Sequence, residues 1–198
     1  MRYVVIIIFS YLLGSIPFGL VVTRLMSKVD IRKLGSGNIG VTNVLRTAGV
    51  LPALLTLLGD VGKGMVAVFL ARYFTGESAF ALLAGAFATI GHNWPIFLNF
   101  KGGKGVASAA GMLLAYRPLV LLTLVLIWLI VLIISRYISL SSIVAAVSLP
   151  LIMLFFKVSL PELVLGIIIA SFTIYRHKDN VKRLREGTEF KFGEKARS

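Results

Sequence analysis

Three segments of the sequence gather glycine, asparagine, serine and basic residues, although each lies next to a strongly apolar stretch. They span residues 35–46, 91–105 and 176–180. Residues with little or no side chain let backbone N–H groups approach an oxyanion closely, and lysine and arginine add positive charge. Together the three segments predict a site for one or two phosphate-bearing ligands.

The first segment offers neutral hydrogen-bond donors and one cation. Ser36, Asn38 and Asn43 carry the donors, and Gly37 leaves the backbone uncovered. Arg46 can hold a phosphate through two parallel N–H groups. The alternative is a flexible loop with an ordinary arginine on the positive side of a membrane.

The second segment contains the run Lys101-Gly102-Gly103-Lys104-Gly105, which precedes an apolar stretch. Because a helix N-terminus favours anions, Lys104 at the start of a helix predicts a phosphate contact. The run is not a nucleotide P-loop, since that motif needs serine or threonine after its lysine. The alternative is a turn between helices whose lysines extend toward the membrane surface.

Four further polar residues lie within apolar stretches. Asp60 and Lys63 are three positions apart, so they share one helix face and can neutralise each other. We expect this pair to support the first segment rather than to contact a ligand. His92 and Asn93 precede the glycine run, and a structural hydrogen bond is the expected role of the histidine.

The third segment contains the histidine that is best placed for proton transfer. His177 can exchange a proton near neutral pH or donate a hydrogen bond to an anion, and the alternative is an interfacial residue in a basic tail. Asn180 follows it by three positions, and Glu186 lies farther along the tail. Ser142, near the start of another apolar stretch, could face the same site or only pack between helices.

The composition predicts one membrane domain over residues 1–198. Of these residues 58% are hydrophobic, and the mean hydropathy is +0.92. The absence of cysteine excludes thiolate chemistry. With only two histidines and eight acidic residues, a metal site is not expected. No other cofactor is expected either. The net charge of +13 fits membrane topology and contact with anionic lipids. We therefore predict neither a nucleic acid nor an obligate protein partner.

The apolar stretches predict an all-α polytopic membrane fold with seven transmembrane helices. The expected spans are 3–23, 50–72, 79–97, 105–117, 118–135, 140–156 and 159–175. The segments on one side, about 24–49, 98–104, 136–142 and 176–198, contain 16 of the 21 lysines and arginines. The positive-inside rule therefore places the N-terminus outside and the C-terminus in the cytoplasm, together with all three motif segments.

The stretch 105–135 can form either two short spans or one long helix. Twelve residues rise only about 18 Å as a helix, which is less than the roughly 30 Å of a hydrocarbon core. Pro118 disfavours helix at Arg117, and one long helix would move the basic C-terminal tail outside. Both points favour a break between Arg117 and Pro118.

Several of these motifs resemble one known family. Residues 35–46 (GSGNIGVTNVLR), 60–64 (DVGKG), 91–95 (GHNWP), 101–107 (KGGKGVA) and the pair His177 and Asn180 resemble the bacterial membrane acyl-phosphate:glycerol-3-phosphate acyltransferases, the PlsY family. The resemblance covers essentially the whole chain. It implies transfer of a fatty acyl group from acyl phosphate to the 1-hydroxyl of glycerol 3-phosphate, giving lysophosphatidic acid and phosphate. This is the first step of bacterial phospholipid biosynthesis, so an inner-membrane location with a cytoplasmic active site is implied.

The resemblance also implies roles for individual residues. Glycerol 3-phosphate would bind to Ser36, Arg46, Lys104, Ser142 and His177. Acyl phosphate would bind to Gly37, Asn38, Asn43, Lys101, Gly102 and Gly103. His177, Asn180 and Lys104 would act at the reacting centre, and the supporting residues would be Asp60, Lys63, His92, Asn93 and Glu186.

Two questions stay open at the level of sequence. The base that accepts the hydroxyl proton is either His177 or a phosphate oxygen of a substrate, with a slight preference for the phosphate. The alternative function is a transporter for an organic phosphate, which the intramembrane Asp60 and Lys63 would suit. Against a transporter, the polar segments lie on one face and not at the midplane. A non-catalytic lipid-binding scaffold would leave the glycine runs unexplained.

Overall fold

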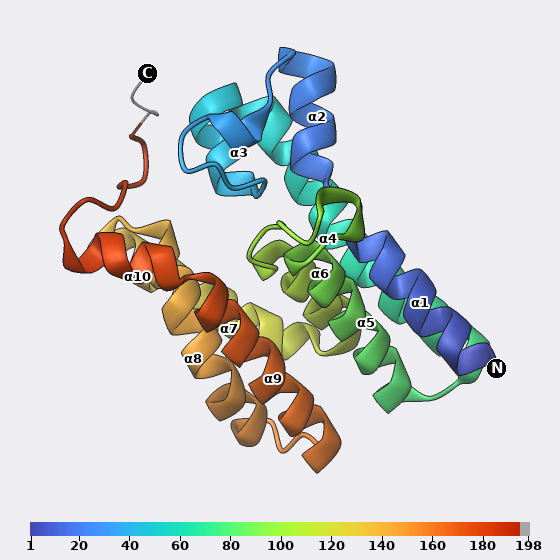
Figure 1. Cartoon of the computed structure of the whole chain (residues 1–198). Helices are drawn as coiled ribbons and strands as arrows, with labels where there is room; N and C mark the ends of the chain where they lie inside the picture. Colours follow the sequence, from blue (N-terminus) through green and yellow to red (C-terminus); the bar gives the residue numbers. More distant parts are fainter. Residues whose placement is uncertain (195–198) are drawn as a thin grey trace.

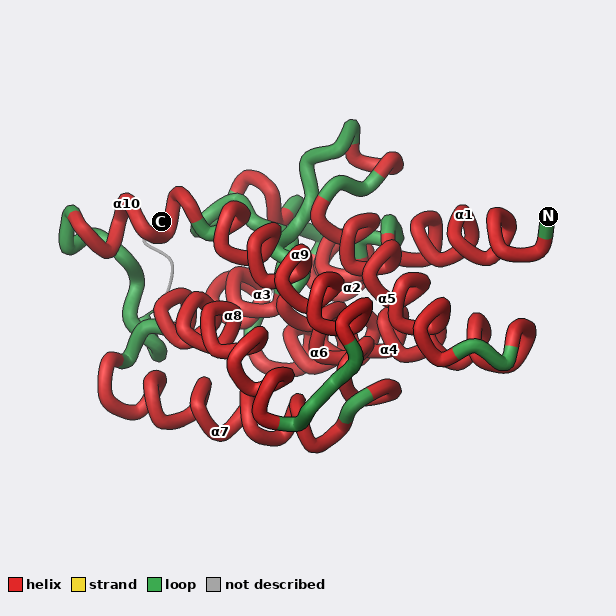
Figure 2. Tube along the Cα trace, turned by 90° about the horizontal axis from the view of Figure 1, so that it is seen from below, coloured by secondary structure: helices red, strands yellow, loops and turns green. Residues whose placement is uncertain are grey.

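The computed structural model describes residues 1–194, and within them every regular element is helical (Figures 1 and 2). The elements are α1 (Arg2–Gly14), α2 (Phe18–Ser27), η1 (Ile31–Lys33), α3 (Val41–Ala48), α4 (Val50–Thr75), α5 (Ser78–Asn93), η2 (Ile96–Leu98), α6 (Val106–Tyr116), α7 (Pro118–Ser135), α8 (Ile138–Phe155), α9 (Leu160–Arg176) and α10 (Lys178–Arg185). The predicted all-α class is confirmed.

Five stretches are long and apolar enough to cross a membrane. They are Arg2–Ser27, Val50–Thr75, Ser78–Leu98, Pro118–Ser135 and Ile138–Phe155. A sixth would combine α9 and α10, which are bent by 52° relative to each other. The 11 residues of α6 rise about 16 Å, short of a hydrocarbon core of roughly 30 Å. The structure thus gives five or six candidate spans where the sequence predicts seven.

The first predicted span, 3–23, is interrupted in the structure. Helix α1 ends at Gly14 and α2 begins at Phe18. Pro17 explains the break, because proline has no N–H to donate to a helical carbonyl and clashes with the preceding turn. The predicted loop 24–49 also differs, since it contains a helix of its own, α3. Local polarity predicted a loop there, whereas α3 packs the apolar side chains of Val44 and Leu45 against a buried cluster beside α2 and α4.

The predicted break between Arg117 and Pro118 is present. Helix α6 ends at Tyr116, and Pro118 is the first residue of α7. The break is held by Glu162 of α9, which accepts hydrogen bonds from Tyr116 Oη and from Arg117 Nη2 at 2.5 Å and 2.9 Å. This cluster lies at the end of α6 opposite to the glycine run.

Small residues allow the central helices to touch through their backbones. A Cβ on Gly64 of α4 would collide with the carbonyl of Ser108 in α6, and one on Gly111 of α6 would collide with the carbonyl of Val61. Close approach at small residues is the usual way in which membrane helices associate. It sets how α6, and with it the glycine run before α6, sits against α4.

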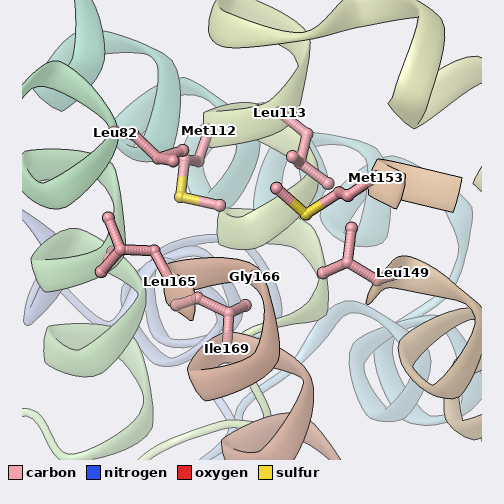
Figure 3. A pocket seen from close by; sticks show the side chains of 9 residues that line it. Leu82, Met112, Leu113, Leu149, Met153, Leu165, Gly166 and Ile169 are labelled. Carbon is pink, nitrogen blue, oxygen red and sulfur yellow. The ribbon is translucent and has the colours of Figure 1, made fainter. Parts of the chain in front are cut away.

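An apolar core fills the space between α5, α6, α8 and α9. Figure 3 shows the side chains of Met112 and Met153 facing each other there, with Leu82, Leu149 and Ile169 around them. The remaining void is only about 10 Å³ and is lined by apolar groups. Flexible methionine side chains fill irregular gaps well, so this region is a packed support beneath the polar ends of the helices.

Candidate active site

The three motif segments meet at one polar pocket of about 90 Å³. The first segment contributes Ser36 and Asn38, and the second contributes Lys104. The end of α9 and α10 contribute the remaining lining residues, which are Tyr175, Arg176, Lys178, Asp179, Asn180 and Arg183. Segments separated by more than a hundred residues along the chain therefore present their polar groups to one space.

Asn43 determines the shape of the first segment. Its Nδ2 donates to the carbonyls of Ile31, Leu34 and Asn38 at 3.3, 3.0 and 2.8 Å. Its Oδ1 accepts the N–H of Ser36 at 3.0 Å. The side chain is buried, and both its amide nitrogen and its amide oxygen bond to the loop. Asn43 thus holds the loop that carries Ser36 and Asn38, and its expected contact with acyl phosphate stays a prediction.

The glycine run packs tightly against the C-terminal end of α5. A Cβ on Gly102 would collide with the carbonyl of His92, and one on Gly103 would collide with the imidazole of His92. The run ends at Gly105, whose φ of +78° is costly for other residues and which precedes the first turn of α6. Lys101 is exposed and does not line the pocket, so its predicted contact remains untested.

Lys104 lies partly buried in the pocket wall. Burial lowers the pKa of its ammonium to about 8, although the carboxylate of Glu189 opposes the shift. The positive charges of Arg183, Arg176 and Arg46 lower the pKa further. An amine in such surroundings gains strongly from a bound anion, because the anion compensates both the desolvation and the repulsion.

His177 follows the last residue of α9 and is buried. Its Nδ1 lies 2.7 Å from the carbonyl oxygen of Thr173. Burial, together with the charge of Lys104, lowers the pKa of the imidazole to about 4, so the ring is neutral at pH 7. Because a carbonyl only accepts hydrogen bonds, Nδ1 carries the proton and Nε2 has a free lone pair.

The C-terminal tail contacts this region through Glu189. The carboxylate accepts hydrogen bonds from Ser139 Oγ, Asn180 Nδ2 and Arg183 Nε, each at 2.7 Å. Burial alone would raise the pKa of Glu189, but these donors lower it. The next residue, Phe190, stacks on the Arg46 guanidinium with 4.2 Å between Cζ and the ring centroid. The tail thus connects α8, α10 and α3.

Two predicted residues make contacts that the sequence did not suggest. Glu186 is exposed and pairs only loosely with Lys182, at 3.9 Å, so the tail carboxylate of the cluster is Glu189. Ser142 Oγ accepts from Trp128 Nε1 at 3.1 Å and donates to the carbonyl of Ile138. Its hydroxyl therefore joins α7 to α8, and its predicted contact with glycerol 3-phosphate stays a prediction.

The charged pair within the membrane region belongs to a larger cluster. Lys63 Nζ lies 2.8 Å from Asp60 Oδ1 and 2.8 Å from His92 Nδ1, and it donates to the carbonyl of Ile16 at 3.1 Å. Ile16 lies in the break between α1 and α2. The cluster links that break, α4 and the end of α5, directly beneath the glycine run. Asn93 is also fully buried, beside Gly105.

Four residues in or beside the site were not predicted from the sequence: Arg176, Ser139, Glu189 and Phe190. Arg176 was visible only as part of a basic segment. In the sequence, Glu189 stands out only as an acidic residue within a strongly basic tail, and the same is true of Glu186. Only the fold distinguishes them.

Comparison with known proteins decides the family. The model of the family described as "Glycerol-3-phosphate acyltransferase" matches residues 4–187. The chain belongs to this family. A glycerol-3-phosphate acyltransferase of Carboxydothermus hydrogenoformans is 50% identical over 93% of this chain and 93% of its own length. One of Desulforamulus reducens is 45% identical over 97% of this chain and 96% of its own length.

Two solved structures share the fold. The crystal structure of PlsY (YgiH), "an integral membrane glycerol 3-phosphate acyltransferase", in its glycerol 3-phosphate form, has a TM-score of 0.91 at 40% identity. The lysophosphatidic acid form has a TM-score of 0.90 at 39% identity, and both alignments cover 98% of this chain and 96% of the other. The predicted family, the acyltransferase class and the integral membrane nature of the protein are confirmed. The family assignment also favours an acyltransferase over the transporter alternative.

Proposed function

We propose that this acyltransferase moves a fatty acyl group from acyl phosphate to the 1-hydroxyl of glycerol 3-phosphate, giving lysophosphatidic acid and phosphate. The observation that carries the proposal is the single pocket in which all three motif segments meet around Lys104. The solved relatives, described in glycerol 3-phosphate and lysophosphatidic acid forms, support this acceptor and this product. Acyl phosphate as the donor rests on the resemblance to the PlsY family.

Charge explains how the pocket would promote the reaction. Both substrates are phosphates, so they repel each other when they approach. Lys104, Arg46 and Arg183 provide positive charge around the pocket, and Ser36 and Asn38 provide neutral donors. Holding both phosphates there converts an encounter between two repelling anions into a reaction between neighbours.

In the reaction the 1-hydroxyl oxygen attacks the acyl carbonyl carbon, and the bond from this carbon to the phosphate oxygen breaks. The hydroxyl proton must leave in the same process. His177, with a pKa of about 4, is a weaker base than a phosphate monoester, whose second pKa is about 6. We therefore assign the proton to a substrate phosphate oxygen, and we assign His177 Nε2 the role of accepting a hydrogen bond that orients the hydroxyl.

Replacing His177 by glutamine tests this assignment. Glutamine retains a hydrogen-bond acceptor but is not a base at neutral pH, so kcat should fall less than about tenfold. Loss of a true general base costs a factor of about 100 to 10,000. The measurement is kcat at saturating glycerol 3-phosphate, with an unchanged thermal midpoint as the control for folding. A fall of a thousandfold would make His177 the base.

The remaining predicted site residues keep their proposed roles. Ser36, Arg46, Lys104, Ser142 and His177 would bind glycerol 3-phosphate, and Gly37, Asn38, Asn43, Lys101, Gly102 and Gly103 would line the acyl-phosphate site. Asn180 would help to position the substrates, and Asp60, Lys63, His92, Asn93 and Glu186 would support them. The support for this division is the placement of the first segment, Lys104 and Asn180 around one pocket.

The function requires a pocket at the boundary between membrane and cytoplasm, because one substrate has an acyl chain and the other is water-soluble. We propose seven passes through the bacterial inner membrane, with the N-terminus outside and the pocket on the cytoplasmic side. This arrangement counts α6 as a short pass. The apolar residues of α6, which continue from the glycine run toward the break at Arg117, support it. The distribution of lysine and arginine supports the orientation.

The function is tested with purified protein, acyl phosphate and glycerol 3-phosphate. Phosphate release and formation of lysophosphatidic acid should appear together and should depend on both substrates. Lys104→Ala should raise KM for glycerol 3-phosphate by about tenfold or more, as expected for a charged hydrogen bond of 1.5–3 kcal/mol. Lys182→Ala, which removes an exposed lysine of α10 that does not line the pocket, is the matched comparison and should leave KM within about twofold. Phosphate release without the acylated product would contradict the proposal.

A further inference from the structure

The glycine run is held from two sides, by the end of α5 and by the end of α9. The N–H of Gly103 donates to the carbonyl of His92 at 3.0 Å. On the other side, Arg176 Nη2 donates to the carbonyl of Gly102 at 2.7 Å. These two groups belong to the same peptide unit, which is planar and carries its C=O and N–H on opposite edges. Each helix therefore fixes one edge of the Gly102–Gly103 peptide.

The guanidinium of Arg176 is itself held in place. Its Nε donates to the carbonyl of Gly103 at 2.9 Å, so one planar group binds two consecutive carbonyls. Its Cζ lies 5.7 Å from the centroid of the Trp94 ring, and Trp94 packs edge-to-face on Phe172 of α9. Among the ion pairs of residues 1–194, none includes Arg176. Its hydrogen bonds are directed at the backbone of the glycine run.

The residue that follows this clamped peptide is Lys104, which lines the pocket. Two consecutive glycines have a wide choice of backbone conformations when nothing restrains them. We propose that Arg176 is a positioning residue: it clamps the Gly102–Gly103 peptide and thereby holds Lys104 where the substrate phosphate binds. This role rests on the proposed function, in which Lys104 contacts the phosphate.

A double-mutant cycle between Arg176 and Lys104 tests the role, with kcat/KM for glycerol 3-phosphate as the measured quantity. Arg176→Ala should lower kcat/KM by about 100-fold, a factor typical of a misplacement by about 1 Å. When Lys104→Ala is already present, adding Arg176→Ala should cost less than about threefold further, because the residue that Arg176 positions is gone. Losses that multiply in the double variant would overturn the proposal, since Arg176 would then act independently of Lys104.

Two further variants control for charge and for folding. Arg185→Ala removes one exposed positive charge from α10 and should leave kcat/KM within about twofold. Arg176→Lys keeps the charge but cannot bind two carbonyls through a planar fork. It should therefore lose activity as well, and it takes the place of Arg176→Ala in the cycle if the alanine variant does not fold. Full activity of Arg176→Lys would overturn the proposal.

The failure of this role and the failure of the proposed function give different results. If Lys104→Ala alone leaves KM for glycerol 3-phosphate unchanged, the proposed phosphate contact is wrong, and the positioning role is overturned with it. If Lys104→Ala is strongly impaired but the losses multiply, the phosphate contact stands and only the role of Arg176 is overturned.

Discussion

At the scale of single residues, the proposed binding of phosphate depends on the protonation state of Lys104. Its surroundings are cationic and partly desolvated, which stabilises the neutral amine and lowers its pKa to about 8. Only the protonated form attracts a phosphate. In the free enzyme Lys104 is therefore mostly protonated below about pH 8 and mostly neutral above it.

The pH dependence of kcat/KM for glycerol 3-phosphate should therefore show an alkaline limb. kcat/KM should fall as the pH rises through about 8, because this ratio reports ionisations of the free enzyme. Lys104→Arg retains the charge to much higher pH and should remove the limb from the range 7–10, even if it lowers the overall rate. A limb that persists in Lys104→Arg would assign the titration to another group.

Two carboxylates of the tail, Glu186 and Glu189, give a matched pair for mutation. Glu189 accepts hydrogen bonds from Ser139, Asn180 and Arg183, so Glu189→Gln leaves a buried network without its charge. We expect it to lower the free energy of unfolding by about 1–3 kcal/mol. Glu186→Gln, at an exposed position, should change it by less than about 0.5 kcal/mol. Thermal unfolding in detergent provides the measurement, and equal effects would contradict the structure of the tail.

At the scale of the elements, the site depends on how closely α4 and α6 approach. Their backbones touch at Gly64 and Gly111, and α6 begins directly after the glycine run. A wider spacing between these helices would move the start of α6 and, with it, Lys104. We therefore expect the glycines of these helices to affect activity although they lie away from the pocket.

Comparing alanine substitutions at Gly64 and Gly62 of α4 separates the effect of the helix contact from the general effect of replacing glycine in a helix. A Cβ at Gly64 would collide with the carbonyl of Ser108, whereas a Cβ at Gly62 meets nothing within 4 Å. Gly64→Ala should therefore destabilise the protein by about 1–3 kcal/mol and lower activity, as overpacking does. Gly62→Ala should be neutral or slightly stabilising. The thermal midpoint and kcat of the two variants are measured side by side. Similar values for both variants would contradict the close contact of α4 with α6.

At the scale of the whole molecule, the C-terminal ends of α5 and α9 and the start of α6 lie on the side that faces the first segment (Figure 1). The apolar core lies between α5, α6, α8 and α9. The tail after α10 runs back toward α3, where Phe190 meets Arg46. The polar pocket thus lies beside helices that are apolar enough to cross a membrane. This placement supports the proposed reaction between a lipid-soluble and a water-soluble substrate.

The absence of cysteine makes the proposed topology simple to test. A single cysteine introduced for Lys33 should react with a membrane-impermeant maleimide only after the cells are permeabilised. One introduced for Lys157, in the exposed turn between α8 and α9, should react in intact cells. The activity of each variant shows that its fold is kept. The reverse labelling pattern would invert the orientation, and labelling of both in intact cells would change the number of passes.

Local features of the sequence were sufficient for the class of fold and for the three segments of the site. Apolar runs predict membrane helices wherever they occur, and the break at Pro118 follows from the ring of a single residue. The clustering of small residues with cations in three segments is likewise visible without a structure. These features are properties of neighbouring residues, so no tertiary contact is needed to see them.

Tertiary structure decided which side chains line the pocket and which ones contact the residues that line it. Ser139 and Ser142 differ in direction by about 60° around α8, so the rotation of the helix sends one to Glu189 and the other to Trp128. The split of the first span, the clamp by Arg176 and the choice of Glu189 over Glu186 depend on contacts between distant segments. The sequence alone determined which residue types were available for the site. Packing determined which of them reach it, because packing sets the rotation of each helix and how closely the helices approach.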